Sequence, residues 1–315
     1  MRLSKRLAPN NYHEHGGMIS QLLKPKHEVR FQKKYKVYHN RWGEFRLLPN
    51  RERQAAFFDP DNWLDFTHLH TDPEHGHQGR RKLDNFQITT RNPATGAVKT
   101  FLFKDHDFST RPVPNEVEAG EEVALARVRG EKPWGYWTDV FGHVYAVFER
   151  MEGHTMVMEP RENWRPLLTA SVQYGRLFAA GLMHGDTGIK HVFITPKKSR
   201  LFDFETVHSE PVDDYRRKDF GNLIGSAVME KRIASIGQVD ACLEALLDGA
   251  KARPSERPLE KRRWKNFLAI HLGMLLRGRR VGLDSLSLKN RMRAKREMVL
   301  LRRMIGLLQK ENGGR

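Results

Sequence analysis

The sequence predicts an α+β fold with two lobes, a small antiparallel sheet followed by a mainly helical part. Short strand-like runs lie between Phe86 and Phe148, and from Leu167 onwards apolar residues recur at helical spacing. Gly153 separates the two patterns. Strands that come first and helices that follow, without regular alternation, are typical of the α+β class.

The predicted sheet begins with a hairpin. Residues 86–91 and 98–104 are strand-like, and the segment between them, Asn92-Pro-Ala-Thr-Gly96, consists of turn formers. Residues 115–128 are acidic at first and apolar later, which predicts a helix whose first turn carries negative charge. Residues 144–148 predict a further strand.

The helical part is predicted to open with a helix that begins near Pro166 and ends before His184. Two short strands, 191–195 and 201–204, are expected to follow on either side of a turn. Helical spacing then returns over residues 218–230.

After a basic, Pro-containing linker at 251–258, helical spacing continues from Trp264 to Leu275, and a basic helical tail begins near Leu288. These elements divide the chain into four predicted parts. The parts are residues 1–80, a basic, His-rich and partly ordered extension; residues 81–152, the sheet lobe; residues 153–255, the helical lobe; and residues 256–315, a basic helical extension of that lobe.

The chain is strongly basic, with 55 Lys and Arg against 38 Asp and Glu and a formal net charge of +17. Such a surface attracts anions of several kinds, including an anionic membrane, a nucleic acid or an acidic sugar. No recognition motif of a common nucleic-acid-binding module is present, so we expect no specific nucleic-acid partner.

The single cysteine, Cys242, lies in the apolar stretch 239–247, which predicts an unreactive thiol in a helix core. One cysteine forms no internal disulfide and fits a reducing compartment. The basic start of the chain has no apolar run behind it, and no window approaches the ~18 apolar residues of a membrane-spanning helix. We therefore expect a cytoplasmic protein.

The sharpest motif is His184-Gly-Asp186-Thr-Gly-Ile-Lys190-His191-Val-Phe-Ile, with Leu201-Phe-Asp203-Phe-Glu205 downstream of it. Phosphoryl transfer from ATP needs a carboxylate near the acceptor hydroxyl, metal ligands on phosphate oxygens, a cation on the phosphates and a hinge for adenine. Both carboxylates of the motif suit these needs. The motif resembles the catalytic loop and the metal-binding aspartate of protein-kinase-like enzymes.

This resemblance implies a two-lobed protein-kinase-like fold that binds ATP and Mg²⁺. By its place in the motif, Asp186 orients the acceptor hydroxyl, Lys190 steadies the moving phosphate, and Asp203 and His191 hold the metal. The histidine at position 191 departs from the pattern, because Mg²⁺ prefers oxygen ligands and imidazole suits Mn²⁺ better.

Residues upstream match the nucleotide site of the same family. Lys104 matches the phosphate-binding lysine, and Glu121 matches its ion-pair partner on the next helix, with Glu118 and Glu122 as alternatives. The backbone from Glu149 to Met151 matches the hinge that meets adenine. The resemblance therefore assigns these residues to ATP binding.

Downstream, Asp219 resembles the aspartate that braces the catalytic loop through backbone hydrogen bonds. Only sixteen positions separate Asp203 from Asp219, and position 185 is Gly rather than Arg, so little room remains for peptide-substrate machinery. Together with His191, these features resemble the bacterial kinases that phosphorylate heptose or Kdo sugars of the lipopolysaccharide inner core. The resemblance implies an anionic sugar or lipopolysaccharide-core acceptor.

Two other functions stay open. A small-molecule phosphotransferase of the aminoglycoside or choline type shares the His-Gly-Asp loop, although its residue at the position of His191 is usually Asn. A non-catalytic pseudokinase scaffold is the second. Glu205 stands where protein kinases have Gly, and Gly76 and Gly79 lack the spacing of a phosphate-binding loop.

The tail from Leu288 to Lys310 mixes basic and apolar residues, which suits peripheral binding to an anionic inner-membrane surface. The alternative is a basic helix whose apolar side packs on the helical lobe. The residues concerned are Lys289, Arg291, Arg293, Lys295, Arg296, Arg302 and Arg303, with Met292, Leu300, Met304, Ile305 and Leu308.

Overall fold

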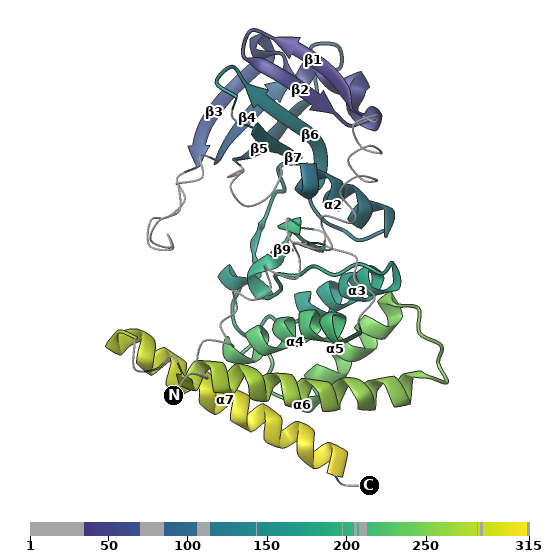
Figure 1. Cartoon of the computed structure of the whole chain (residues 1–315), viewed down its shortest axis with the longest axis vertical. Helices are drawn as coiled ribbons and strands as arrows, with labels where there is room; N and C mark the ends of the chain where they lie inside the picture. Colours follow the sequence, from purple (N-terminus) through teal and green to yellow (C-terminus); the bar gives the residue numbers. More distant parts are fainter. Residues whose placement is uncertain are drawn as a thin grey trace, which may run out of the picture. The chain divides into compact units, whose positions relative to one another are not determined.

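A computed structural model describes the chain over residues 35–69, 85–105, 114–142, 144–196, 198–204, 213–281 and 286–313, and at residues 207 and 283. The chain falls into two compact units (Figure 1). Unit 1 runs up to Pro114 and also includes Trp134–Val147. Unit 2 consists of Asn115–Pro133 and Phe148–Arg315. From Phe148, directly before the predicted hinge, the rest of the chain belongs to unit 2.

Seven strands make up the sheet of unit 1. They are β1 (Lys36–Asn40), β2 (Gly43–Leu47), β3 (Trp63–Leu69), β4 (Asn85–Arg91), β5 (Val98–Asp105), β6 (Lys132–Asp139) and β7 (Val144–Glu149). Their order in the sheet is β1-β2-β6-β7-β5-β4-β3 (Figure 1). The neighbours β1–β2, β2–β6, β3–β4 and β4–β5 pair antiparallel.

The predicted hairpin at residues 86–104 is confirmed as β4 and β5. In its turn, the Asn92 carbonyl accepts from Gly96 N at 2.8 Å, and the Asn92 side chain accepts from Ala94 N at 3.0 Å. The alternation of the strand is also as predicted, because Phe103 is buried while Lys104 is half-buried on the other face.

The core of unit 1 is largely aromatic. The rings of Phe86 and Phe103 stack with centroids 4.7 Å apart, and Trp134 is fully buried. Two further rings come from a 3₁₀ segment, η2 (Pro49–Phe58), that follows β2. The buried aromatic residues are Phe45, Phe57, Phe58, Phe86, Phe101, Phe103, Trp134, Trp137 and Tyr145.

The sheet begins earlier in the chain than we predicted. Strands β1, β2 and β3 come from residues 1–80, where we expected only a partly ordered extension. Both ends of the seven-strand order are therefore formed by this region, and its edge strands β1 and β3 expose most of their side chains. Exposed edge strands carry charged and polar residues, which is why their periodicity was weak in the sequence.

Unit 2 is mainly helical, as predicted. Its helices are α2 (Pro114–Leu125), α3 (Pro166–Ala179), α4 (Asp213–Met229), α5 (Ile236–Gly249), α6 (Arg257–Val281) and α7 (Leu288–Gly313). Three short strands pair in the order β10-β9-β8; they are β8 (His154–Thr155), β9 (Val192–Ile194) and β10 (Ser199–Leu201). Helix α2 belongs to this unit, although we predicted it within the sheet lobe.

The predicted strand over residues 201–204 is wrong at its end, because β10 stops at Leu201. Asp203 has a φ of +68°, a left-handed conformation that lies outside the extended region of a regular strand. The strand therefore ends two residues before Asp203, and Asp203 lies in the turn that follows it. Cys242 of α5 is fully buried, and burial raises the pKa of its thiol to about 12, so the predicted unreactive core thiol is confirmed.

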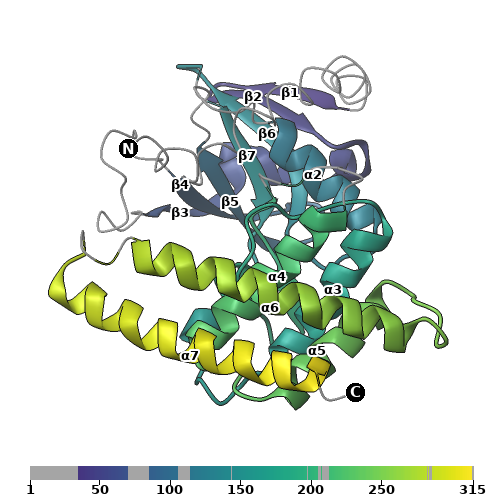
Figure 2. The ribbon, with the colours of Figure 1, turned by 60° about the horizontal axis from the view of Figure 1, so that its bottom comes forward.

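The basic tail is the helix α7, which packs along α6 (Figure 2). Leu301, Met304 and Leu308 lie in the same buried cluster as α3, α4 and α5. The predicted membrane role of Met304 and Leu308 is therefore wrong, since these side chains face the core. Among the helices of the described residues, none is both long and apolar enough to cross a membrane.

Candidate active site

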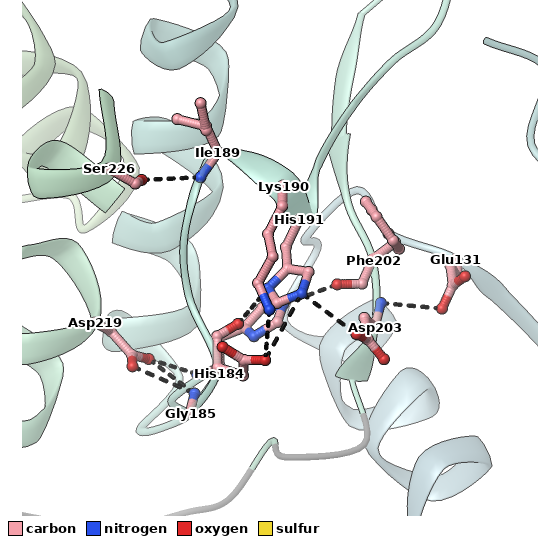
Figure 3. Close-up of polar contacts among 11 residues, drawn as sticks. Glu131, His184, Gly185, Ile189, Lys190, His191, Phe202, Asp203, Asp219 and Ser226 are labelled. Carbon is pink, nitrogen blue, oxygen red and sulfur yellow. Dashed lines mark hydrogen bonds and ion pairs between the residues drawn. The ribbon is translucent and has the colours of Figure 1, made fainter. Parts of the chain in front are cut away.

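The loop after α3 carries Asp186, and Asp219 of α4 holds the backbone of this loop (Figure 3). The Asp219 carboxylate accepts hydrogen bonds from the backbone N of His184 at 2.7 Å and of Gly185 at 3.2 Å. The Thr187 hydroxyl donates to the Asp219 carbonyl at 2.9 Å. Asp219 is 3% exposed, so the bracing contact that the sequence predicted is confirmed.

Two backbone features shape the loop around Asp186. Gly185 has a φ of +86°, which glycine adopts without steric cost and arginine does not. This conformation explains why a glycine stands at position 185. Further along, Ile189 N donates to the hydroxyl of Ser226 on α4 at 3.0 Å, at the start of a single 3₁₀ turn, η6 (Ile189–His191).

The turn η6 places the side chains of Lys190 and His191 next to Asp186. Lys190 Nζ donates to Asp186 Oδ2 at 3.1 Å, and both side chains are more than half exposed. His191 is almost buried, and its Nδ1 contacts the backbone carbonyl of Asp186. Since a carbonyl only accepts hydrogen bonds, we place the ring proton on Nδ1.

His191 also connects the two carboxylates of the site. Its Nε2 lies 3.3 Å from Asp203 Oδ2 and 3.8 Å from Asp186 Oδ2 (Figure 3). Burial lowers the pKa of His191, and the neighbouring Lys190 lowers it further, whereas the two carboxylates raise it. In a ring protonated on Nδ1 alone, the lone pair of Nε2 would face these two carboxylate oxygens. A cation beside Nε2 would relieve that repulsion.

The described residues contain no group of three or more His, Cys, Asp or Glu side chains arranged to hold a metal ion. Asp186, His191 and Asp203 are therefore not a closed metal cage. A cation held there would need oxygen ligands from outside the protein, such as phosphate oxygens and water.

Asp203 is positioned by residues that the sequence analysis missed. Its backbone N donates to Glu131 Oε2 at 3.2 Å, and Glu131 is 7% exposed. The adjacent Gly130 is required by packing, because a Cβ there would come within 2.4 Å of the buried Phe204 ring. Glu131 stands alone before β6 without a motif around it, so only the three-dimensional structure reveals this contact.

His184 ties the loop to the hairpin that carries Asp203. Its Nε2 lies 3.0 Å from the carbonyl oxygen of Phe202, to which it donates, and its ring stacks on His191 with centroids 5.5 Å apart. Burial lowers the pKa of His184 to about 4, so the ring is neutral near pH 7. His184 therefore fixes the distance between the loop and the hairpin rather than supplying charge.

The other predicted site residues lie on separate elements. Lys104 is on β5 of unit 1, whereas Glu121 is half-buried on α2 of unit 2. Glu149 ends β7 and pairs with Lys132 at 3.5 Å, and Met151 is half-buried just after it. Their roles in ATP binding stay predictions. Glu205, Gly76 and Gly79 lie outside the described residues.

No protein-family model matches this sequence, and no curated protein matches it significantly. What the site can do must therefore be argued from its own geometry. That geometry brings together four of the predicted residues, which are Asp186, Lys190, His191 and Asp203.

Removing the brace at Asp219 should destabilise unit 2. Asp219→Ala leaves the buried backbone N of His184 without its acceptor, which costs about 1–3 kcal/mol, and also removes the acceptor of Gly185 N in an exposed residue. Urea unfolding should therefore show a loss of stability of about 1–3 kcal/mol. Asp219→Asn keeps one acceptor oxygen, so its loss of stability should be smaller. The matched control is Asp248→Ala, which removes an exposed aspartate from α5. Equal losses for the Asp219→Ala and Asp248→Ala variants would contradict the bracing role.

Proposed function

We propose that this protein is an ATP-dependent phosphotransferase that phosphorylates a hydroxyl group of a non-protein acceptor. The sequence resemblance favours a sugar of the lipopolysaccharide inner core as the acceptor. One observation carries the proposal. Two carboxylates from different elements, Asp186 and Asp203, both lie within 4 Å of the same imidazole nitrogen. The loop that carries Asp186 is held in place by the buried Asp219.

The two carboxylates have environments that suit different roles. The Asp186 side chain is 51% exposed, so it can meet an acceptor hydroxyl and take up its proton. Lys190, 3.1 Å from Asp186, can stabilise the negative charge on the transferred phosphate. The Asp203 side chain is 32% exposed, and the backbone N of the same residue donates to the buried Glu131, which suits a ligand that must stay in one place.

The residues present also fit a metal–nucleotide complex better than a resident metal. Mg²⁺ keeps several waters and binds through one or two carboxylates together with substrate phosphates. Asp203 supplies such a carboxylate, and His191 Nε2 lies 3.3 Å from it. When bound, the ion would neutralise the charge that develops on the phosphate oxygens. Asp203 and His191 would hold it, and Asp186 would act on the acceptor.

The acceptor is expected to be small and anionic. Residues 204–212 are all that separates Asp203 from the first residue of α4, which leaves little chain to bind an extended peptide. The net charge of +17 favours an acidic or phosphorylated sugar over a neutral or cationic molecule. The same short segment is compatible with a small-molecule phosphotransferase, so the acceptor must be tested directly.

The test is ATP consumption by the purified full-length protein. We expect ADP release to rise with lipopolysaccharide-core acceptors that carry heptose or Kdo, and not with aminoglycosides, choline or peptides. Stimulation by an aminoglycoside or choline instead would identify the small-molecule alternative. No ADP above the level of the Asp186→Asn variant, with any acceptor, would show a non-catalytic protein.

A histidine at the metal position should alter the metal preference. Because imidazole binds Mn²⁺ better than Mg²⁺, the wild-type protein should be more active with Mn²⁺. In the His191→Asn variant, the amide oxygen should raise activity with Mg²⁺ relative to Mn²⁺ by several-fold. Initial rates in each metal, at equal ATP, measure this ratio. An unchanged ratio in the Asn variant would remove His191 from the metal site.

A further inference from the structure

One face of α7 is exposed along the whole helix, opposite the side that packs in unit 2 (Figure 2). Leu288, Met292 and Val299 are 75%, 51% and 61% exposed. The same face carries exposed Lys and Arg side chains, which are Lys289, Lys295, Arg296, Arg302, Arg303 and Lys310. The buried side is formed instead by Ala294, Met298, Leu301, Met304 and Leu308.

The order of these side chains around the helix is that of an interfacial helix. At about 100° per residue, Leu288, Met292 and Val299 fall along the middle of the exposed face. Lys289, Arg296 and Arg303 fall on one flank, and Lys295 and Arg302 on the other. The apolar line runs from Leu288 to Val299 between the two rows of cations, and Lys310 continues it near the end of the helix. Such an arrangement is suited to lie flat in the headgroup region of a bilayer.

Among the described residues, no acidic side chain pairs with the exposed cations of this face. The two acidic residues of α7 point to the packed side, where Glu297 pairs with Arg279 at 3.1 Å and Glu311 pairs with Lys265 at 2.9 Å. Within the described part of the chain, Lys289, Lys295, Arg296, Arg302, Arg303 and Lys310 form no ion pair. The acidic side chains of α7 are thus paired on its packed side, whereas the six cations named above are exposed to solvent.

We propose that this face of α7 docks on an anionic lipid bilayer. A second copy of the chain is disfavoured as the partner, because two such faces would bring their cations together. A nucleic acid would use the cations but would leave Leu288, Met292 and Val299 in water. A bilayer with anionic headgroups satisfies both, since its charge meets the cations and its acyl boundary takes up the three apolar side chains.

The inference narrows the set of tail residues that the sequence suggested, and it does not depend on the proposed phosphotransfer. Met292 is kept, Leu288 and Val299 are added, and the buried Met304 and Leu308 are left out. The two ideas can fail separately. The Asp186→Asn variant should lose ATP turnover and bind vesicles like the wild type.

The experiment is co-sedimentation of the full chain with vesicles of pure phosphatidylcholine, or of phosphatidylcholine with phosphatidylglycerol. We expect binding to the anionic vesicles alone, weakened by 0.5 M NaCl. Arg296→Gln/Arg303→Gln and Met292→Gln/Val299→Gln should each weaken it at least five-fold. Their matched controls in the same unit, Arg161→Gln/Arg165→Gln and Val157→Gln/Met158→Gln, alter exposed residues of the same types and should bind like the wild type.

Three outcomes would overturn the proposal. One is absence of binding to anionic vesicles. A second is equal loss of binding in the α7 variants and their controls, which would indicate attraction by net charge alone. The third is tighter binding of the wild type to a 20-nucleotide RNA than to anionic vesicles, with the apolar pair having no effect on either, which would assign the cations to nucleic acid.

Discussion

Replacing Asp186 with Asn is expected to reduce phosphoryl transfer by about 10³-fold, because the amide neither takes up a proton nor carries the charge that orients the acceptor hydroxyl. The fold should be unaffected. The Asp186 side chain is half exposed, and the contact with His191 Nδ1 uses the backbone carbonyl, which the substitution retains. Thermal unfolding and nucleotide binding should therefore stay close to the wild type.

The measurement is the single-turnover rate at saturating ATP and acceptor. Asp248→Asn provides the control, since that aspartate is exposed on α5 and pairs with Arg257 at 2.6 Å. Lys190→Gln tests the neighbouring cation, and it should reduce the single-turnover rate by less than Asp186→Asn does. A rate for Asp186→Asn within ten-fold of the wild type, with the fold intact, would remove Asp186 from the chemistry.

Much of unit 2 could be predicted because its signals are local. In α3, α4, α6 and α7, the apolar residues recur at helical spacing because one face of each helix is buried. The contact between Asp219 and the backbone of His184 spans 35 positions, yet it was predicted because both residues belong to the pattern that resembles a family motif. The helical pattern by itself contains no such pairing.

The remaining features depend on contacts between distant residues. Strand β1 pairs only with β2 at the edge of the sheet, so it is exposed and polar, and its sequence resembles a basic extension. The Glu131 side chain accepts one hydrogen bond from the backbone N of Asp203, which lies 72 positions away in the sequence. The exposed and buried sides of α7 were also not separable by composition, because Met and Leu occur on both.

Replacing Asp203 with Asn should nearly abolish turnover as well, with a fall in kcat/KM for the metal–ATP complex of about 10³-fold, since it removes the carboxylate that faces His191 Nε2. Asn is a better test than Ala. Asp203 has a left-handed φ of +68°, which Asn tolerates and which costs Ala about 1 kcal/mol of stability. Asp203→Ala would therefore combine a loss of ligand with a strained backbone.

The variant Asp203→Gly separates the two effects. Glycine adopts a positive φ freely, so the backbone bond from residue 203 to Glu131 can form while the carboxylate is absent. We expect Asp203→Gly and Asp203→Asn to be equally inactive, with Mn²⁺ restoring neither, and Asp203→Ala to unfold at a lower urea concentration than Asp203→Asn. If the Asn or the Gly variant turned over ATP and acceptor near the wild-type rate, residue 203 would serve only to shape the turn after β10.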